Sequence, residues 1–354
     1  MARPAISWEW RPMIISRTPF RISFFGGGTD YPVWFKENGG AVLSTTIDKY
    51  CYINCRYLPP FFEHRNRIVW SRIETVVDVS EIQHPIVRET LRYMGIDEGV
   101  EIHHDGDLPA RAGLGSSSSF TVGLLHGLRA LKGVMPSKRQ LALDAIEIEQ
   151  NRLKENVGSQ DQVSAAFGGL NRIDFTADGD FRVQPVVLPA DRRATLRQSL
   201  MLFFTGVSRT ASEVAGEQIK ATPKNAPELS VMYQLVEEAM SVLCNDAPLS
   251  EFGRLLHEGW ELKRGLTDRI STPRVDQIYE AARRTGALGG KLLGAGGGGF
   301  MLFFVPPENQ AKVRDALRDL LYVPFDLESS GSQIIFYEPD EAGAASSAGA
   351  TSER

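Results

Sequence analysis

The chain is poor in cysteine, lacks a long apolar run and carries no excess of positive charge. Its three cysteines, Cys51, Cys55 and Cys244, show no metal-site pairing. Because Cys51 and Cys55 fall in an apolar, strand-like run, we expect buried thiols in a reducing compartment. The longest uncharged stretch, residues 292–306, is too short to span a membrane, and residues 1–13 lack the apolar core of a signal peptide. These absences predict a soluble cytoplasmic protein with no membrane partner.

The charge balance argues against a dedicated nucleic-acid binder. The formal net charge is −5, whereas such proteins usually present a basic face. Hydrophobic residues make up 42% and charged residues 23% of the 354 residues, the ordinary balance of a soluble globular protein, and the length predicts about two domains. Small molecules that carry phosphate stay compatible with this charge, because they need only a local positive site.

Strand-like and helix-like segments mix along the chain without the strict repeat of a parallel α/β fold, which predicts an α+β fold. A short extension at residues 1–12 and a disordered tail at residues 339–354 enclose domains predicted at 13–192 and 193–338. The expected strands cover residues 21–25, 50–55, 100–103, 170–175, 201–204, 300–305 and 333–337. The expected helices cover residues 118–131, 138–154, 228–244, 249–262 and 274–285.

The most informative motif is a Gly/Ser loop that leads into an apolar helical pattern. It consists of Gly113, Leu114, Gly115, Ser116, Ser117, Ser118 and Ser119. Such a loop leaves backbone N–H groups unpaired at the helix start, with the positive end of the helix dipole behind them. This arrangement binds anions, typically phosphate. A Ser-rich helix cap explains the same residues equally well when they are taken alone.

A second glycine motif follows the first expected strand. Gly27 and Gly28 precede Thr29 and Asp30, and a run of glycines lets the backbone approach a ligand closely. Asp30 is suited to accept hydroxyl protons from a sugar. The alternative is a glycine turn in which Asp30 serves as an Asx residue.

A third glycine motif occupies residues 289–299 and leads into an apolar strand. The entropic cost of ordering so many glycines indicates backbone packed against a ligand or another main chain. The dinucleotide fingerprint is not met, because no helix follows. A P-loop is absent too, since Lys291 is followed by leucine.

Two carboxylates complete the candidate site. Glu149 falls on the apolar stripe of the helix expected at 138–154, whereas Glu147 points away. A buried carboxylate needs a partner, and either a divalent cation or a nearby arginine would serve. Asp161 follows a glycine turn twelve residues later, where it is suited to accept or orient a hydroxyl proton, or to cap a helix.

Together these segments resemble the GHMP kinase superfamily, which includes galactokinase, homoserine kinase, mevalonate kinase and phosphomevalonate kinase. The resemblance spans about residues 14–338 and has the three family motifs in order. The middle motif is similar to the family signature Pro-x-x-x-Gly-Leu-Gly-Ser-Ser, and here it begins at Pro109. The last motif is similar to that of mevalonate kinase, with Leu293 in place of threonine. The resemblance implies a ribosomal-protein-S5-like N-terminal domain and a ferredoxin-like C-terminal domain, with the site between them.

The resemblance also implies a role for each motif residue. Residues 113–119 would wrap the phosphates of ATP, and Ser117 and Glu149 would bind Mg²⁺. Asp161 would be the catalytic aspartate, and Arg21 the arginine that pairs with it. Phosphoryl transfer needs these functions: charge neutralisation on the phosphates, in-line positioning and an acceptor for the hydroxyl proton. The last motif would support the site through Gly294, Gly296, Gly297 and Gly298.

The second motif bears on the substrate. Galactokinases carry Gly-Glu-His-Thr-Asp-Tyr there, and this chain lacks the Glu-His pair. The Gly-Gly-Gly-Thr-Asp form, and the segment from Thr205 onward, most resemble bacterial D-glycero-D-manno-heptose 7-phosphate kinases, which act in nucleotide-heptose synthesis for surface polysaccharide. A substrate that already bears a phosphate needs a second cationic site, preferably arginine. The candidates are Arg56, Arg111 and Arg209, and for each of them a solvated surface arginine is the alternative.

The sequence analysis thus predicts an ATP- and Mg²⁺-dependent kinase that phosphorylates the anomeric hydroxyl of a sugar or sugar phosphate. Other readings are a kinase for fucose, a uronic acid or a galactose-like sugar, and a GHMP-fold sensor without turnover. A sensor would have no need of Asp161 and Arg21 aimed at an acceptor. The expected assembly is a monomer or homodimer.

Overall fold

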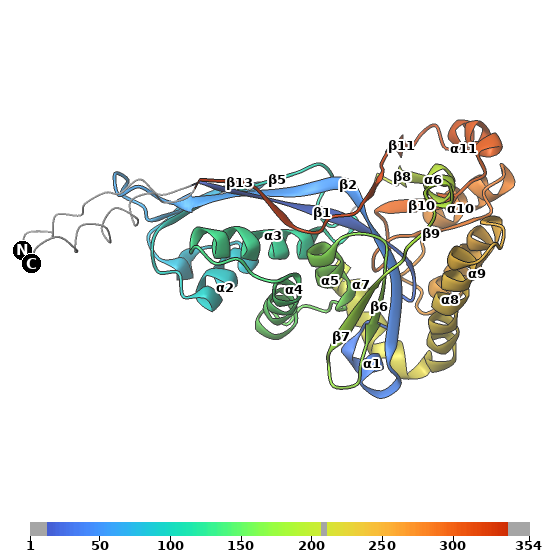
Figure 1. Cartoon of the computed structure of the whole chain (residues 1–354), viewed down its shortest axis with the longest axis horizontal. Coiled ribbons are helices and arrows are strands. Elements are labelled where there is room, and N and C mark those ends of the chain that lie inside the picture. The colour runs from blue at the N-terminus through green and yellow to red at the C-terminus, as the bar shows by residue number, and fades with distance from the viewer. Residues whose placement is uncertain (1–12, 207–210, 339–354) are drawn as a thin grey trace, which may run out of the picture.

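The computed structural model describes residues 13–206 and 211–338, and these form two β-sheets with helices packed on them (Figure 1). The predicted extension at 1–12 and tail at 339–354 lie outside the described residues. Within the described part of the chain, no helix is both long and apolar enough to cross a membrane.

The first sheet is built around two long antiparallel strands. Its strands run in the order β13–β1–β2–β5–β3–β4, and β2 also pairs with β12 and with β6, which in turn pairs with β7. The bounds are β1 Ile14–Phe25, β2 Gly40–Tyr57, β3 Asn66–Val69, β4 Ile73–Val76, β5 Val100–Gly106, β6 Asn171–Phe175, β7 Phe181–Pro185, β12 Leu327–Glu328 and β13 Gln333–Tyr337.

Burial along β1 shows how the two halves of the molecule meet. The strand alternates between buried and partly exposed residues at its start and is buried on both faces from Thr18 to Phe25. The C-terminal part of β1 is covered on both faces. Helices α8 and α9, from the second half of the chain, pack on one face, and helices from the first half of the chain cover the other. A strand covered on both faces reads as a continuous apolar run. The polar Arg21 within this buried run therefore needs a partner.

The helices of the first half lie on one face of the first sheet (Figure 1). Helix α3 packs directly against β1 and β2, and α2, α4 and α5 surround it. The bounds are α1 Pro32–Asn38, η1 Val79–Glu81, α2 Pro85–Met94, α3 Ser116–Leu131, α4 Lys138–Ile146, η2 Glu147–Arg152 and α5 Gln160–Phe167. The expected helix at 138–154 is thus an α-helix that widens into the π-helical turn η2.

The second sheet has the strand order β11–β8–β10–β9. Along the chain it is built as a strand, a helical segment, two strands, a helix and a strand. This connectivity, with the last strand beside the first, confirms the predicted ferredoxin-like arrangement. The bounds are α6 Ala190–Gln198, β8 Leu200–Phe204, α7 Ala211–Ala221, η3 Thr222–Lys224, α8 Ala226–Cys244, α9 Ser250–Gly265, α10 Pro273–Arg284, β9 Gly289–Leu292, β10 Phe300–Phe304, η4 Pro307–Asn309, α11 Gln310–Ala316 and β11 Leu321–Tyr322.

The end of the chain returns to the first sheet. Strand β12 pairs with β2, and β13 pairs with β1 from Ile14 to Arg17. A single boundary near residue 192 therefore does not separate the two sheets, and the predicted division at 192 stays a prediction. Every strand and helix expected from the sequence is present, although β1 and β2 extend well beyond the predicted 21–25 and 50–55. The thiols of Cys51 and Cys55 are buried, as predicted.

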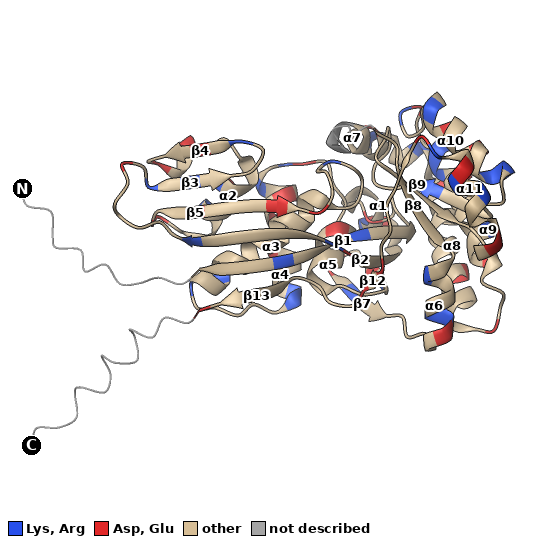
Figure 2. Cartoon of the chain, turned by 90° about the horizontal axis from the view of Figure 1, so that it is seen from above, with Lys and Arg blue, Asp and Glu red and all other residues tan. Residues whose placement is uncertain are grey.

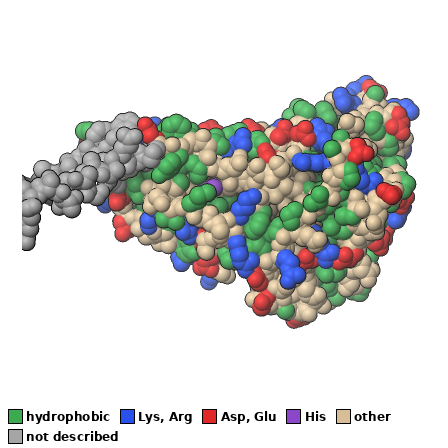
Figure 3. Space-filling view, in the orientation of Figure 1, with side chains coloured by type: hydrophobic (Ala, Val, Ile, Leu, Met, Phe, Trp, Pro, Cys, Tyr) green, Lys and Arg blue, Asp and Glu red, His purple; other side chains and the backbone are tan. Residues whose placement is uncertain are grey.

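Charge is distributed without a dominant sign over the visible surface. Basic and acidic residues are interspersed along both sheets and their helices (Figure 2). They are likewise mixed on the face drawn in Figure 3.

Candidate active site

The centre of the candidate site is an ion pair between Arg21 on β1 and Asp161 in the first turn of α5. Arg21 Nε donates to Asp161 Oδ1 at 2.7 Å, and Nη2 donates to Oδ2 at 2.8 Å, which is the fork geometry of a bidentate pair. The Arg21 side chain is almost fully buried, while a quarter of the Asp161 side chain is exposed. Arg21 also donates from Nη1 to the carbonyl of Gly113 at 2.7 Å. The pair is thereby fixed to the Gly/Ser loop.

The Gly/Ser loop ends in the N-terminus of α3, as predicted. Gly115 is the N-cap residue, with a φ of 74°, and no side chain caps the first N–H groups of the helix. A Cβ at Gly115 would lie 3.5 Å from Asp161 Cγ, so the loop contacts the ion pair. The unpaired N–H groups and the helix dipole make this a site for an anion beside Asp161.

The serines of this loop have different surroundings. Ser116 Oγ accepts from the backbone N–H of Arg111 at 3.0 Å, and Ser119 Oγ donates to the carbonyl of Pro19 at 2.9 Å. The Ser119 side chain therefore anchors α3 to β1 rather than facing a ligand. Leu114 is buried and its carbonyl accepts from the backbone N–H of Arg21 at 3.0 Å. Ser117 and Ser118 face Glu149.

Glu149 is fully buried in the π-helical turn η2, as its place on the apolar stripe predicts. Its carboxylate accepts from Ser118 Oγ at 2.8 Å and from Thr121 Oγ1 at 2.7 Å, and also from the amide of Gln162. No arginine or lysine forms an ion pair with it among the residues described. Burial raises the pKa of Glu149 to about 7. A π-helical turn in this position is frequent at functional sites, because it re-aims side chains within a helix.

These residues fit a magnesium ion that also binds nucleotide phosphates. Mg²⁺ is usually held by one or two carboxylates together with phosphate oxygens and water. The Ser117 hydroxyl lies 3.5 Å from Glu149 Oε1, and Ser117 is an exposed residue of the Gly/Ser loop. No group of three or more His, Cys, Asp or Glu side chains suited to a metal occurs among the described residues. A cation here would thus depend on ligands that the nucleotide supplies.

The second glycine motif lies against the turn that precedes α5. Asp30 is buried, and its carboxylate accepts from the backbone N–H of Gly28 at 2.9 Å and of Gln160 at 3.4 Å. Burial raises the pKa of Asp30, and the nearby charge of Asp161 adds to the increase. The Asx-turn alternative does not describe this geometry, because the carboxylate bonds backward to Gly28.

Gly27 and Gly28 line this side of the site, but the Thr29 hydroxyl is fully used by the main chain. The single hydroxyl proton of Thr29 is shared between the carbonyls of Gly26 and Ala41, which lie 2.8 and 2.9 Å from Oγ1, and Oγ1 accepts from the N–H of Ala41. Its hydroxyl therefore holds the turn and is not free for a substrate. A small cavity adjoins the motif and is lined by Gly28, Tyr31, Gln218, Thr222, Asn225, Leu229 and Leu266.

The third glycine motif packs main chain against main chain, as its composition predicts. A Cβ at Gly294 would lie 2.4 Å from the Cα of Gly113, and one at Gly296 would lie 2.7 Å from the Cα of Ile270. Gly297 donates its N–H to the carbonyl of Ile270. Gly298 has a φ of 154° within the same turn. The third glycine motif therefore packs against the Gly/Ser loop from the side of the second sheet.

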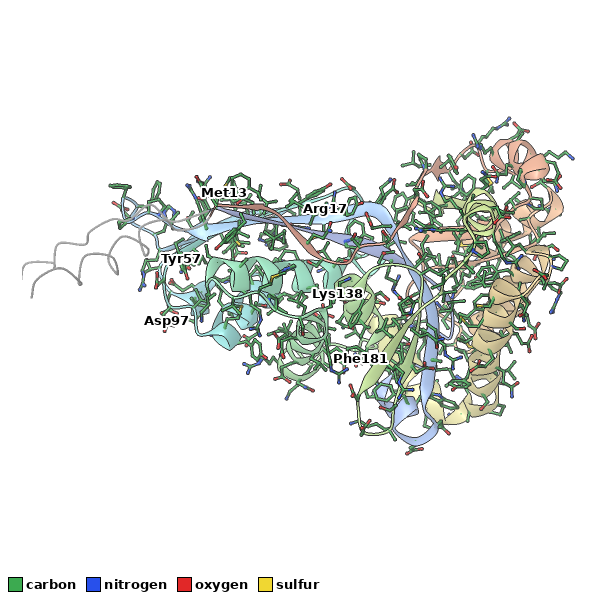
Figure 4. All side chains as sticks on the ribbon, in the orientation of Figure 1. Met13, Arg17, Tyr57, Asp97, Lys138 and Phe181 are labelled. Atoms are coloured by element: carbon green, nitrogen blue, oxygen red, sulfur yellow. The ribbon has the colours of Figure 1, made fainter. Side chains whose placement is uncertain are left out.

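The three arginines predicted to bind a substrate phosphate have different positions. Arg56 forms an ion pair with Glu101 and lies just beyond Cys55, which pairs with Ile14 at the start of β1. About 40 Å of strand separate that end of β1 from the glycine turn at its other end. Its neighbour Tyr57 marks this remote end in Figure 4. The structure thus does not bring Arg56 to the site.

Arg111 lies two residues before the Gly/Ser loop, with a φ of 60° and an exposed side chain, and its backbone N–H donates to Ser116 Oγ of the loop. Of the two predicted arginines within the described residues, Arg111 is therefore the one that lies near the candidate site. Arg209 lies outside the described residues.

Two groups of residues were missed by the sequence analysis. Lys263 at the end of α9 and Lys291 on β9 are both almost fully buried at the site. The ring of Phe120, which directly follows the loop, stacks on His84 with centroids 4.8 Å apart, and Trp70 meets His84 edge-on at 4.8 Å. No local pattern marks either group, since their members come from separate elements. Lys291 belonged to a recognised motif, but its spacing predicted no role.

Family models match both halves of the chain. The model described as "GHMP kinases N terminal domain" matches residues 82–169, and that described as "GHMP kinases C terminal" matches residues 240–323. The first match contains the Gly/Ser loop, Glu149 and Asp161. The second contains Lys263 and the third glycine motif.

This chain is also similar, over most of its length, to individual proteins and to a solved structure. It is 27% identical over 321 residues to the D-glycero-alpha-D-manno-heptose 7-phosphate kinase of Campylobacter jejuni, covering 86% of this chain and 93% of the relative. It is 26% identical over 347 residues to the L-fucokinase/L-fucose-1-P guanylyltransferase of Bacteroides fragilis, covering 85% of this chain and 35% of that protein. A crystal structure of a D-glycero-D-manno-heptose 1-phosphate kinase from Bacteroides thetaiotaomicron aligns with a TM-score of 0.72 at 24% identity, covering 92% of this chain and all of the other. That structure has the same fold.

Proposed function

The chain belongs to the GHMP kinase family, which makes it a phosphotransferase acting on a hydroxyl group, and we propose that it phosphorylates the anomeric hydroxyl of D-glycero-D-manno-heptose 7-phosphate. The product would be the 1,7-bisphosphate, with ATP as the donor. The observation that carries the proposal is the bidentate Arg21–Asp161 pair held against the N-terminus of α3.

In this proposal the residues divide the work of phosphoryl transfer. The N–H groups at residues 113–118 bind the phosphates of ATP, and Asp161 accepts the proton of the attacking hydroxyl. Arg21 orients the Asp161 carboxylate and faces the charge that develops on the transferred group. Glu149 and Ser117 would hold Mg²⁺. When bound, the cation neutralises charge on the β- and γ-phosphates.

The ring system beside the loop suits the base of the nucleotide. Phe120 follows the phosphate loop directly and stacks on His84. Burial lowers the pKa of His84 to about 4, so its ring is neutral at pH 7 and can stack on a flat base. We therefore assign the nucleobase to the side of the loop where Trp70, His84 and Phe120 lie.

The acceptor would lie on the other side of Asp161, against Gly27, Gly28 and Asp30. Asp30 faces this side as a buried carboxylate next to Asp161 and is suited to hold a sugar hydroxyl. Arg111 is the candidate for the 7-phosphate, and Arg56 is not, because it lies at the remote end of the sheet. A kinase for another sugar is the second candidate, which the fucokinase relative favours.

Release of ADP from Mg-ATP over a panel of acceptors tests the proposal. The panel is D-glycero-D-manno-heptose 7-phosphate, sedoheptulose 7-phosphate, mannose 6-phosphate, galactose, fucose and glucuronate. We expect turnover with the heptose 7-phosphate and not with its unphosphorylated competitors. Turnover of fucose or another free sugar in its place would refute the acceptor and keep the kinase.

A further inference from the structure

The two buried lysines at the site have no role in the mechanism above. Lys263 and Lys291 are 6% and 5% exposed. Burying an ammonium group is costly unless the charge is paired. Among residues 13–206 and 211–338, neither ammonium forms an ion pair within 4.0 Å, and each has a single hydrogen bond to a main-chain carbonyl. Lys263 Nζ donates to Gly294 at 2.5 Å, and Lys291 Nζ donates to Phe24 at 2.8 Å.

A short chain of contacts joins Lys263 to the ion pair. The Gly294 carbonyl that accepts from Lys263 belongs to the residue whose backbone touches Gly113. The Gly113 carbonyl in turn accepts from Arg21, which is bonded to Asp161. Lys263 therefore approaches the phosphate loop from the second sheet, opposite Arg21 on the first.

Basic side chains outnumber carboxylates around Lys263. Besides Arg21 and Lys291, the groups that act on it are the carboxylates of Asp30 and Asp161. Asp161 is already paired with Arg21. Three buried basic side chains thus share two carboxylates. Burial lowers the pKa of Lys263 to about 8 and raises that of Asp30, and no ion pair within 4.0 Å joins these two described side chains.

An ammonium has three N–H donors, and Lys263 uses one of them within the described residues. The remaining donors of this ammonium, which has no ion pair within the described residues, call for an anion at this place. A phosphoryl group is an anion that the proposed reaction brings here, between the phosphate loop and Asp161.

We propose that Lys263 is a second cationic contact, opposite Arg21, for the phosphoryl group that passes from ATP to the acceptor. This inference rests on the proposed kinase function. In the step, the acceptor oxygen forms a bond to the γ-phosphorus while the bond to the β–γ bridging oxygen breaks. The hydroxyl proton goes to Asp161, and ADP leaves. Lys263 exchanges no proton and forms no covalent bond; it lowers the energy of the charge spread over the equatorial oxygens.

The variants Lys263→Met and Lys263→Arg, with Lys312→Met as a matched control, test this role. Lys312 is an exposed lysine on helix α11, in the same half of the chain as Lys263. The measurements are kcat and KM on whichever panel acceptor the wild type turns over, calorimetric affinities for ATP and for ADP without acceptor, and the melting temperature. We expect Lys263→Met to lower kcat by about 100-fold. It should weaken ATP relative to ADP, with ADP affinity preserved and the melting temperature not lowered. Lys263→Arg should recover part of kcat because it keeps the charge, and Lys312→Met should match the wild type.

Three results would overturn the inference. One is a kcat for Lys263→Met within threefold of the wild type. Another is a loss confined to the acceptor KM, which would assign the lysine to a phosphate carried by the acceptor. The third is a parallel loss of ADP affinity and melting temperature in both Lys263 variants, which would make the lysine structural. If the wild type turns over no acceptor of the panel, the proposed function fails, and the comparison of ATP with ADP still decides the role of Lys263.

Discussion

The close approach of Gly294 to Gly113 predicts that the third glycine motif holds the Gly/Ser loop in position, and a substitution at Gly294 tests this prediction. Replacing Gly294 with alanine adds a Cβ that would meet the Cα of Gly113 at 2.4 Å. Both atoms belong to or extend from main chain, so no flexible side chain can move aside. The matched control is Gly133→Ala. Gly133 has a φ of +70°, close to the +77° of Gly294, and nothing lies within 4 Å of its added Cβ.

The two variants share one destabilising effect and differ in the other. A left-handed φ costs alanine about 1 kcal/mol in either place. Overpacking adds about 1–3 kcal/mol where the backbone must shift, and this applies to Gly294→Ala alone. We therefore expect a fall in the free energy of unfolding of about 1 kcal/mol for Gly133→Ala and about 2–4 kcal/mol for Gly294→Ala.

Urea unfolding followed by circular dichroism measures these changes, and titration calorimetry measures ATP affinity. We expect ATP to bind at least about tenfold more weakly to Gly294→Ala, because the loop whose N–H groups face the phosphates is displaced. Gly133→Ala should bind ATP like the wild type. Equal stability and equal ATP affinity in the two variants would refute the idea that this close approach holds the loop.

Four further outcomes follow from the site. Asp161→Asn should lower kcat by about 10³-fold with ADP affinity unchanged, since the amide cannot take the hydroxyl proton; full activity would remove Asp161 from the chemistry. Glu149→Gln should raise the Mg²⁺ concentration needed for half-maximal activity, measured by Mg²⁺ titration at constant ATP; an unchanged curve would place the cation elsewhere. Arg56→Ala should leave the KM for a sugar 7-phosphate within twofold, whereas Arg111→Ala should raise it by about tenfold for a lost charged contact; the reverse order would contradict the assignment. Lys263→Met should be more stable than the wild type at pH 7. Burial lowers the pKa of Lys263 from 10.5 to about 8, which costs the folded wild type about 3 kcal/mol of stability. The variant is relieved of this cost but loses a hydrogen bond worth about 1 kcal/mol, so a net gain in stability remains. Because only the unfolded chain keeps this proton between pH 8 and 10.5, the stability gap in urea unfolding should close as pH rises through that range, and a gap that widens would refute the sign.

The fold was predictable where the signal is local. Helical spacing after Ser119 marks α3, and alternation and apolar runs mark the strands, since both depend on neighbours along the chain. The ends of β1 and β2 were not predictable, because their extra length depends on pairing with β13 and β5 and on cover from α8 and α9. The π-helical turn at Glu149 was missed for the same reason: it adjusts the helix to its neighbours in space.

The candidate site divides along the same line. The sequence by itself determined the phosphate loop, the buried place of Glu149 and the family, because glycine spacing and helical period are properties of short segments. The pairing of Arg21 with Asp161 was implied by the resemblance, and the structure supplies its bidentate geometry. Only the tertiary structure decided that Arg56 lies far from the site and that the Thr29 hydroxyl is occupied by its own turn. It alone showed two buried lysines beside the loop. Apart from the turn at Thr29, these facts are contacts or separations between residues tens to hundreds of positions apart, which arise only when distant segments of the chain fold against one another.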